Sequence, residues 1–118
     1  MKIRHILTLL LLVSLRSQLF AATPVDALLE RIDKGASHKF VIEKTESDAD
    51  FFEISSRNGK PLIRGNSYVS IASGINWYLK YRLGIHLAWN SMHATLPTTL
   101  PLPEKTERHD TDIKLSLI

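Results

Sequence analysis

The apolar and polar positions along the chain predict two amphipathic helices with short β-rich runs between them. In the longer helix, apolar residues recur at steps of one, three or four positions, which places them on one face toward a core. These residues are Tyr68, Ile71, Ala72, Ile75, Tyr78, Leu79 and Leu83. Ser67 can cap the start of this helix, and Gly84 can end it. Gly74 in its middle predicts a close approach between the helix and a sheet.

A shorter helix is predicted over residues 24–34. Thr23 can cap it, and Pro24 suits the first helical position because its fixed backbone angle matches a helix. Asp26 falls in the first turn, where the helix dipole favours a negative charge. Gly35 suits the position just after the helix ends. The apolar stripe of this helix consists of Leu28, Leu29 and Ile32.

Four β-strands are predicted, over residues 39–44, 51–55, 61–65 and 85–89. Asn58 and Gly59 lie between the second and third strands, and this dipeptide is a strong signal for an antiparallel hairpin. The first strand is expected to pair beside that hairpin. The order α-β-β-β-α-β predicts an α+β fold, with a small, mostly antiparallel sheet of about four strands and two helices packed on one face.

The first 22 residues have the three parts of a secretory signal peptide. A basic start at Lys2 and Arg4 precedes the largely apolar residues 6–15. Small residues at Ala21 and Ala22 then offer a cleavage site. The apolar run is shorter than the roughly 20 residues needed to span a bilayer. We therefore expect export to the periplasm or the medium, with no membrane span after cleavage.

After Trp89 the chain changes character. Residues 97–103 hold three prolines, a density that argues against a helix or a central strand and predicts an extended connector. Residues 113–118 alternate like a strand, and the sequence then ends. The sequence is therefore divided into a signal peptide over residues 1–22, an α+β domain over 23–95, and a proline-rich connector with a tail over 96–118.

Composition removes several classes of function. The formal net charge is +3, but three of the 15 basic residues lie in the signal peptide, which leaves 12 basic residues against 12 acidic ones. A neutral mature chain offers no basic face to phosphate groups, so we expect no nucleic acid partner. The chain has no cysteine, which excludes disulfides, zinc–thiolate sites and thiol nucleophiles.

No group of residues has the spacing of a catalytic or metal site. A glycosidase needs two carboxyl groups that face one bond, but the clustered acidic residues fall mostly on a predicted polar loop. They are Glu43, Glu46, Asp48, Asp50 and Glu53. The histidines of the mature chain lack the i, i+4 spacing of a helical zinc site. They are His38, His86, His93 and His109. We therefore expect no catalytic residue, no metal and no cofactor.

Four aromatic side chains lie within thirteen residues, at Trp77, Tyr78, Tyr81 and Trp89. Tyr78 belongs to the core stripe of the longer helix, and Trp89 ends a predicted strand where it can close the core. Trp77 and Tyr81 lie outside that stripe, so their rings could contact a neighbouring domain or stack on sugar rings. Contact with the core or another domain is the favoured interpretation. Trp77 and Tyr81 are the candidate carbohydrate-binding residues.

Residues 64–102 carry a set of motifs in a fixed order. Arg-Gly-Asn-Ser at 64–67 leads into a helix with Ser-Gly-Ile-Asn-Trp-Tyr-Leu-Lys-Tyr at 73–81. His-Leu-Ala-Trp-Asn and Leu-Pro-Thr-Thr-Leu-Pro follow, at 86–90 and 96–101. This order resembles the N-terminal domain of the α-N-acetylglucosaminidase family of glycoside hydrolases, and in particular bacterial members that act on host glycans. The resemblance extends over residues 24–113.

The resemblance implies a small, non-catalytic first domain whose partner is a (β/α)₈-like catalytic barrel. In that family, two glutamates on the barrel remove terminal α-linked N-acetylglucosamine, and no residue of this sequence corresponds to them. The family continues near Lys114 with a tyrosine-rich strand that this sequence lacks, so we expect a fragment truncated before the barrel. Two alternatives stay open: a stand-alone carbohydrate-binding module, and a small enzyme of unknown type.

Overall fold

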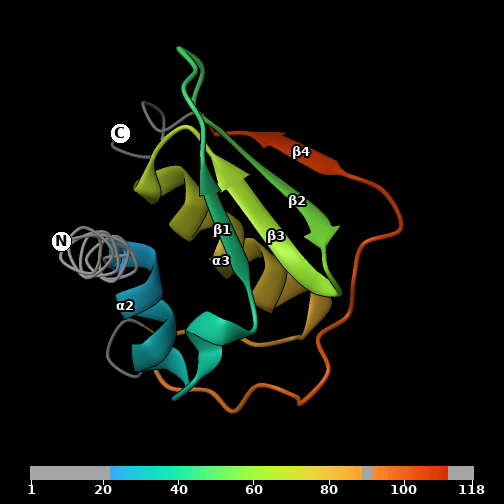
Figure 1. Ribbon diagram of the computed structural model, residues 1–118. Coiled ribbons are helices and arrows are strands. Elements are labelled where there is room, and N and C mark those ends of the chain that lie inside the picture. Colours follow the sequence, from blue (N-terminus) through green and yellow to red (C-terminus); the bar gives the residue numbers. More distant parts are fainter. Residues whose placement is uncertain (1–21, 89–91, 112–118) are drawn as a thin grey trace, which may run out of the picture.

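The computed structural model describes residues 22–88 and 92–111, which form a four-stranded sheet with helices against one face (Figure 1). The helices are α2 (Pro24–Ile32), the 3₁₀ helix η1 (Ala36–His38) and α3 (Tyr68–Arg82). The strands are β1 (Val41–Lys44), β2 (Phe51–Arg57), β3 (Lys60–Gly65) and β4 (Glu107–Asp110). The predicted α+β class is confirmed. The predicted signal peptide up to Ala21, Trp89 and the tail over 113–118 lie outside the described residues.

The sheet has the strand order β1-β3-β2-β4. β2 pairs antiparallel with both β3 and β4, whereas β1 pairs parallel with β3. The sheet is therefore mixed and mostly antiparallel. The turn between β2 and β3 is the predicted hairpin, with φ 53° at Asn58 and φ 76° at Gly59. Positive φ at both central residues belongs to a type I′ turn, whose twist matches that of the flanking strands.

α2 begins with a reciprocal capping box. The Thr23 hydroxyl accepts a hydrogen bond from the Asp26 backbone N–H at 3.1 Å, and the Asp26 carboxylate accepts one from the Thr23 backbone N–H at 2.9 Å. The helix ends at Ile32, before the predicted residue 34. Gly35, with φ 85°, then begins η1. The left-handed conformation that the sequence suggested for Gly35 is therefore present, one turn after the helix ends.

α3 packs closely on the sheet at a glycine. A Cβ added to Gly74 would lie 2.8 Å from Ile63 Cγ2 and 3.0 Å from Phe52 Cδ2. The predicted close approach is therefore confirmed, because a larger residue would meet both side chains. The predicted ends are also confirmed, since the Ser67 hydroxyl accepts a hydrogen bond from a first-turn N–H and Gly84 has φ 67°.

The core lies between the helices and the inner face of the sheet. Along β2, Phe52 and Ile54 are buried on either side of the less buried Glu53, as expected for a sheet whose inner face is covered. Phe51 at the start of the strand is buried as well. The buried core residues on α2 and α3 are Val25, Leu29, Ile32, Ile71, Ile75, Tyr78 and Leu79.

The predicted strand over 85–89 is wrong. Its described residues form no strand, apart from an isolated bridge residue at Ala88. The Ile85 N–H instead donates to the Leu79 carbonyl oxygen at 2.8 Å, which folds the chain back against α3. Ile85 and Leu87 are partly buried against the core, so they reproduce the alternation of a strand without its pairing. β4 takes the place of the fourth strand, beside β2.

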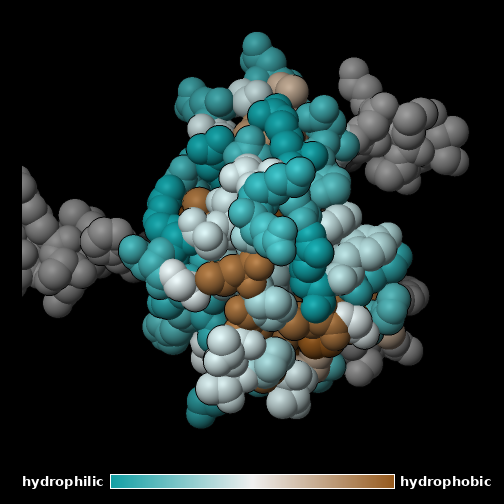
Figure 2. Space-filling model, turned by 90° about the vertical axis from the view of Figure 1, so that its right-hand side faces the viewer, coloured by the Kyte–Doolittle hydropathy of each residue, from teal (hydrophilic) through white to brown (hydrophobic). Residues whose placement is uncertain are grey.

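Residues 92–106 form no helix or strand, which agrees with the extended connector predicted from the prolines over 97–103, but they are attached to the core. Leu96 and Leu100 are buried, and the Tyr78 hydroxyl donates to the Pro101 carbonyl oxygen at 2.7 Å. Figure 2 shows the side of the molecule that carries this segment, where hydrophobic side chains gather in one patch on a mostly hydrophilic surface. The connector is therefore part of the packed structure.

Candidate functional site

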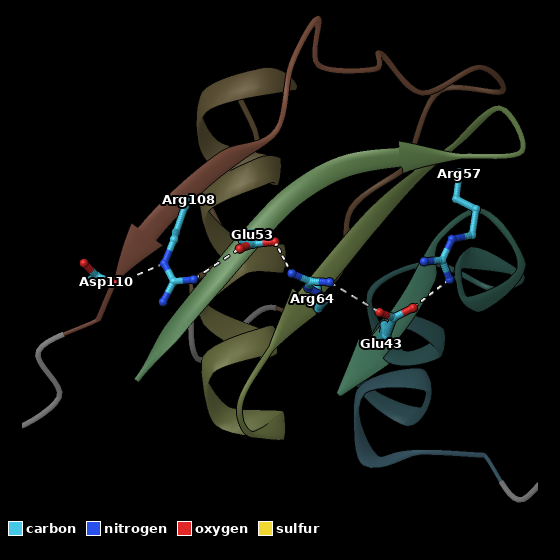
Figure 3. A network of polar contacts seen from close by, with 6 residues as sticks. All are labelled: Glu43, Glu53, Arg57, Arg64, Arg108 and Asp110. Carbon is cyan, nitrogen blue, oxygen red and sulfur yellow. Dashed lines mark hydrogen bonds and ion pairs between the residues drawn. The ribbon is translucent and has the colours of Figure 1, made fainter. Parts of the chain in front are cut away.

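A row of alternating charges crosses the outer face of the sheet (Figure 3). Glu43, Arg64, Glu53 and Arg108 occupy paired positions on β1, β3, β2 and β4, in that order. Arg64 Nη2 lies 2.9 Å from Glu53 Oε2, and its Nη1 lies 3.7 Å from Glu43 Oε1. Arg108 Nη1 lies 3.3 Å from Glu53 Oε1. Opposite charges on neighbouring strands stabilise their pairing, so this charge row links all four strands.

Two of the acidic residues considered for catalysis belong to the charge row. Glu53 lies between Arg64 and Arg108, and Glu43 also pairs with Arg57, whose Nη1 is 2.7 Å from Glu43 Oε2. Glycoside hydrolysis requires two carboxyl groups that are free to face one bond. On the outer face of the sheet, Glu43 and Glu53 are paired with arginines, so this face does not offer two free carboxyl groups. The other acidic residues lie on the loop between β1 and β2, as predicted: Glu46, Asp48 and Asp50.

The fold stabilises the charged form of one further carboxylate, that of Glu30 near the end of α2. It accepts hydrogen bonds from the backbone N–H groups of Ser37 at 2.9 Å and Gly35 at 3.1 Å. These donors lower the pKa of Glu30 because they bind its charged form. A glycosidase acid needs the opposite shift. Glu30 therefore fixes the turn from α2 into η1.

The histidines considered as ligands lie on separate segments. His38 is on η1, His86 and His93 follow α3, and His109 is on β4. Among the described residues, no group of three or more His, Cys, Asp or Glu side chains could hold a metal ion. Within residues 22–88 and 92–111, no helix has the length and apolar character required to cross a membrane.

The candidate carbohydrate-binding residues Trp77 and Tyr81 lie side by side on α3. Their ring centroids are 4.9 Å apart, with 45° between the ring planes. Tyr81 is 58% exposed, whereas Trp77 is half-buried. Basic side chains flank both rings, with Lys80 5.1 Å from the Tyr81 centroid and Arg82 5.5 Å from that of Trp77. The structure thus presents one open aromatic ring beside a partly covered one.

β4 covers Trp77. The ring of His109 lies 4.5 Å from that of Trp77 and stacks on Phe52 at 5.0 Å. At the end of α3, Arg82 forms an ion pair with Glu107. These contacts were not predicted, because residues 104–112 are charged and polar and lack the apolar alternation of a strand. Trp77 therefore contacts the core and β4, in agreement with the favoured interpretation.

Tyr78 is buried, as predicted from the core stripe of α3. Its ring meets Phe40 edge-on at 5.5 Å, and its hydroxyl is bound to Pro101. Burial raises the pKa of Tyr78 to about 12. This residue holds the proline-rich segment against α3.

These elements define a two-layer α+β domain with a charged outer sheet face and an aromatic pair on α3. Residues 23–102 match the family described as alpha-N-acetylglucosaminidase (NAGLU) N-terminal domain. The chain belongs to this family, which confirms the resemblance read from residues 64–102. No curated protein sequence matches the chain.

The chain is also similar to solved structures of a family 89 glycoside hydrolase from Clostridium perfringens. The complex of that enzyme, CpGH89, with its substrate GlcNAc-α-1,4-galactose shares 30% sequence identity at a TM-score of 0.67. The complexes with PUGNAc and with 2-acetamido-1,2-dideoxynojirmycin share 31% identity, at TM-scores of 0.63 and 0.62. Each match covers 75% of this chain but 10% of the solved chain. The matched region is thus a small part of a much longer enzyme.

Proposed function

We propose that residues 23–111 form the non-catalytic N-terminal domain of an exported glycoside hydrolase of the α-N-acetylglucosaminidase family. Its role is to pack against the catalytic barrel of that enzyme and support it. The observation that carries this proposal is the family match over residues 23–102, taken with the 10% of the solved enzyme that the match covers. Because the matched region is a tenth of the solved enzyme, the other nine tenths are available to supply the catalytic residues.

The described side chains support a non-catalytic role. The carboxylates Glu43 and Glu53 pair with arginines on an open sheet face, and the backbone donors at Glu30 favour its ionised form. Neither arrangement supplies the proton donor that glycoside hydrolysis requires. The sequence of residues 1–22 supports export.

The test of the catalytic part of the proposal is a hydrolysis assay of the purified chain. We expect no release of a chromophore from an α-N-acetylglucosaminide, with CpGH89 as the active control in the same buffer. Hydrolysis by this chain above the buffer rate, if it persisted after further purification, would contradict the proposal.

Export is tested separately, by N-terminal sequencing of the protein recovered from the periplasm and the medium. We expect a mature chain that begins at Thr23. A chain that retained Met1 and stayed in the cytoplasm would contradict export and leave the domain assignment intact.

A second candidate function is carbohydrate binding by Trp77 and Tyr81. The observation that favours it is the exposure of Tyr81, at 58%, beside the indole of Trp77. Titration with N-acetylglucosamine would then change the tryptophan fluorescence, and Tyr81→Ala would abolish the change. His86→Ala, at an exposed position after α3, is the control. No change at millimolar sugar would remove this candidate.

A further inference from the structure

A row of side chains along α3 is exposed at its two ends and half-buried at its two middle positions. Val69, Ser73, Trp77 and Tyr81 follow one another at intervals of four residues, so each neighbours the next along a ridge that winds partly around the helix. Val69 is 64% and Tyr81 58% exposed. They are two of the three exposed large hydrophobic residues in the described part of the chain. We call these four residues the α3 row.

β4 runs alongside the α3 row in the opposite direction. At its start, Glu107 pairs with Arg82 at the end of α3, and farther along His109 lies against Trp77. β4 is also an edge strand, because it pairs with β2 on one side only. In residues 22–88 and 92–111, no strand pairs with its other side. An open edge presents backbone N–H and C=O groups that can pair with a further segment.

The path of the chain leads from β4 to the beginning of the α3 row. The Thr111 N–H donates to the Asp50 carbonyl oxygen at 2.8 Å, and the Asp50 carboxylate accepts a hydrogen bond from the Asn66 side chain at 2.9 Å. Asn66 stands two residues before α3. Thr111, the last described residue, therefore lies near the start of α3, where the α3 row begins.

We propose that the α3 row and the open edge of β4 together form the surface on which the catalytic portion of the enzyme docks. This inference rests on the proposed function, because the occupant is the polypeptide that follows Thr111 in a longer hydrolase of this family. Continuity of the chain favours this occupant, since the segment after β4 starts at the surface itself. Aromatic side chains such as Trp77 and Tyr81 are enriched at the centres of protein interfaces.

The outer sheet face is the less suitable docking surface. Its charge row would have to lose solvent beneath another domain, and desolvation of ion pairs can exceed their mutual attraction. Glu43, Arg64 and Arg108 keep side-chain exposures of 32%, 37% and 48%. The α3 row carries no such charge at its four positions.

The test compares two proteins by footprinting. One is the full chain alone, and the other is a fusion in which the chain up to Thr111 is joined to the catalytic portion of the C. perfringens enzyme. Hydroxyl-radical labelling followed by mass spectrometry reports the exposure of each side chain. We expect Val69 and Tyr81 to be labelled in the isolated chain and protected several-fold in the fusion. Leu102, which is 43% exposed and lies off the row, is the internal control and should keep its labelling.

A pair of variants in the same fusion gives a second measurement. Tyr81→Glu places a charge in the docking surface and should lower the melting temperature of the fusion more than that of the isolated chain. Ala27→Glu adds the same charge at an exposed position of α2 and should lower neither. Equal effects of Tyr81→Glu in the fusion and in the isolated chain would overturn the proposal.

The remaining outcomes separate the surface from the proposed function. An active fusion with unprotected Val69 and Tyr81 overturns the docking surface alone. A fusion that is inactive or insoluble, while the intact C. perfringens enzyme is active, also counts against this surface. A catalytic portion equally stable and active without the chain overturns the supporting role itself.

Two further outcomes concern the occupant of the row. Protection that grows with the concentration of the isolated chain assigns the row to a second copy, and protection by N-acetylglucosamine assigns it to a sugar. Either result overturns the proposed occupant.

Discussion

The hydroxyl of Tyr78 donates a 2.7 Å hydrogen bond to the carbonyl oxygen of Pro101, and this bond joins α3 to the proline-rich segment. The two partners are 23 positions apart in the sequence. Because Pro101 precedes β4 by only a few residues, the bond helps to position residues 101–106 before that strand.

Replacing Tyr78 by Phe tests this bond. We expect the free energy of unfolding to fall by about 1 kcal/mol, the typical net contribution of an intramolecular hydrogen bond. Urea unfolding followed by circular dichroism measures the change. Tyr81→Phe is the matched control, because its exposed ring should tolerate the loss of the hydroxyl. An unchanged midpoint for Tyr78→Phe would show that the bond contributes nothing to stability.

The same residue predicts a loss of stability in alkali. Burial raises the pKa of Tyr78 from its ordinary 10.0 to about 12. The unfolded chain therefore loses this proton near pH 10, while the folded chain keeps it to about pH 12. The contribution of Tyr78 to stability is complete below pH 10 and is lost as the pH rises from 10 to about 12. Urea midpoints across this range measure it, and Tyr78→Phe should lack this part of the decline. An identical decline in both proteins would assign it to other groups.

Gly74→Ala should destabilise the domain although alanine favours a helix by about 1 kcal/mol. The added Cβ would lie 2.8 Å from Ile63 Cγ2 and 3.0 Å from the Phe52 ring, and both are rigid core groups. Overpacking typically costs about 1–3 kcal/mol, so the net loss should be about 1 kcal/mol. Asn76→Ala, on the exposed side of the same helix, should be neutral or stabilising. Thermal unfolding compares the two, and a stabilised Gly74→Ala would refute close packing at this position.

Glu53→Gln should weaken the charge row. The Glu53 side chain is 14% exposed and lies between Arg64 and Arg108, so its neutralisation leaves both arginines without their shared partner. We expect a loss of about 1 kcal/mol at low salt, near the upper end for a partly exposed pair. The difference should shrink at high salt because ions screen the pairs. Asp110→Asn, at 79% side-chain exposure, is the control. Equal effects of the two substitutions in urea unfolding would show that the row does not act through Glu53.

The parts of the fold that were predicted depend on neighbouring residues. The type I′ turn follows from Asn58 and Gly59, and the starts of the two helices follow from the side chains of Thr23 and Ser67. Each of these signals acts within one turn of the chain, so no knowledge of distant packing is required.

The errors arise where long-range packing decides the structure. Residues 85–88 alternate because Ile85 and Leu87 fill gaps beside α3, and that alternation is indistinguishable from a strand in the sequence. β4 was missed for the opposite reason. Its residues Glu107–Asp110 are charged and polar, and they become a strand only through pairing with β2.

The contacts of the candidate site also divide into local contacts, which the sequence predicts, and long-range contacts, which it does not. The contact between Trp77 and Tyr81 follows from their spacing on one helix, so it was predictable. The contact between the rings of His109 and Trp77 was not predictable, because it depends on the register of β4 against β2.

The position of β4 has a consequence for synthesis of the protein. A ribosome releases the chain from its N-terminus, so the β2–β3 hairpin and α3 emerge well before Glu107–Asp110. Until those four residues emerge, the outer edge of β2 has no partner and the indole of Trp77 lacks its cover. Among the strands that the structure describes, β4 is the last to leave the ribosome. A nascent chain released only as far as residue 106 therefore carries an unpaired backbone edge on β2 and an uncovered indole, both of which a chaperone can bind.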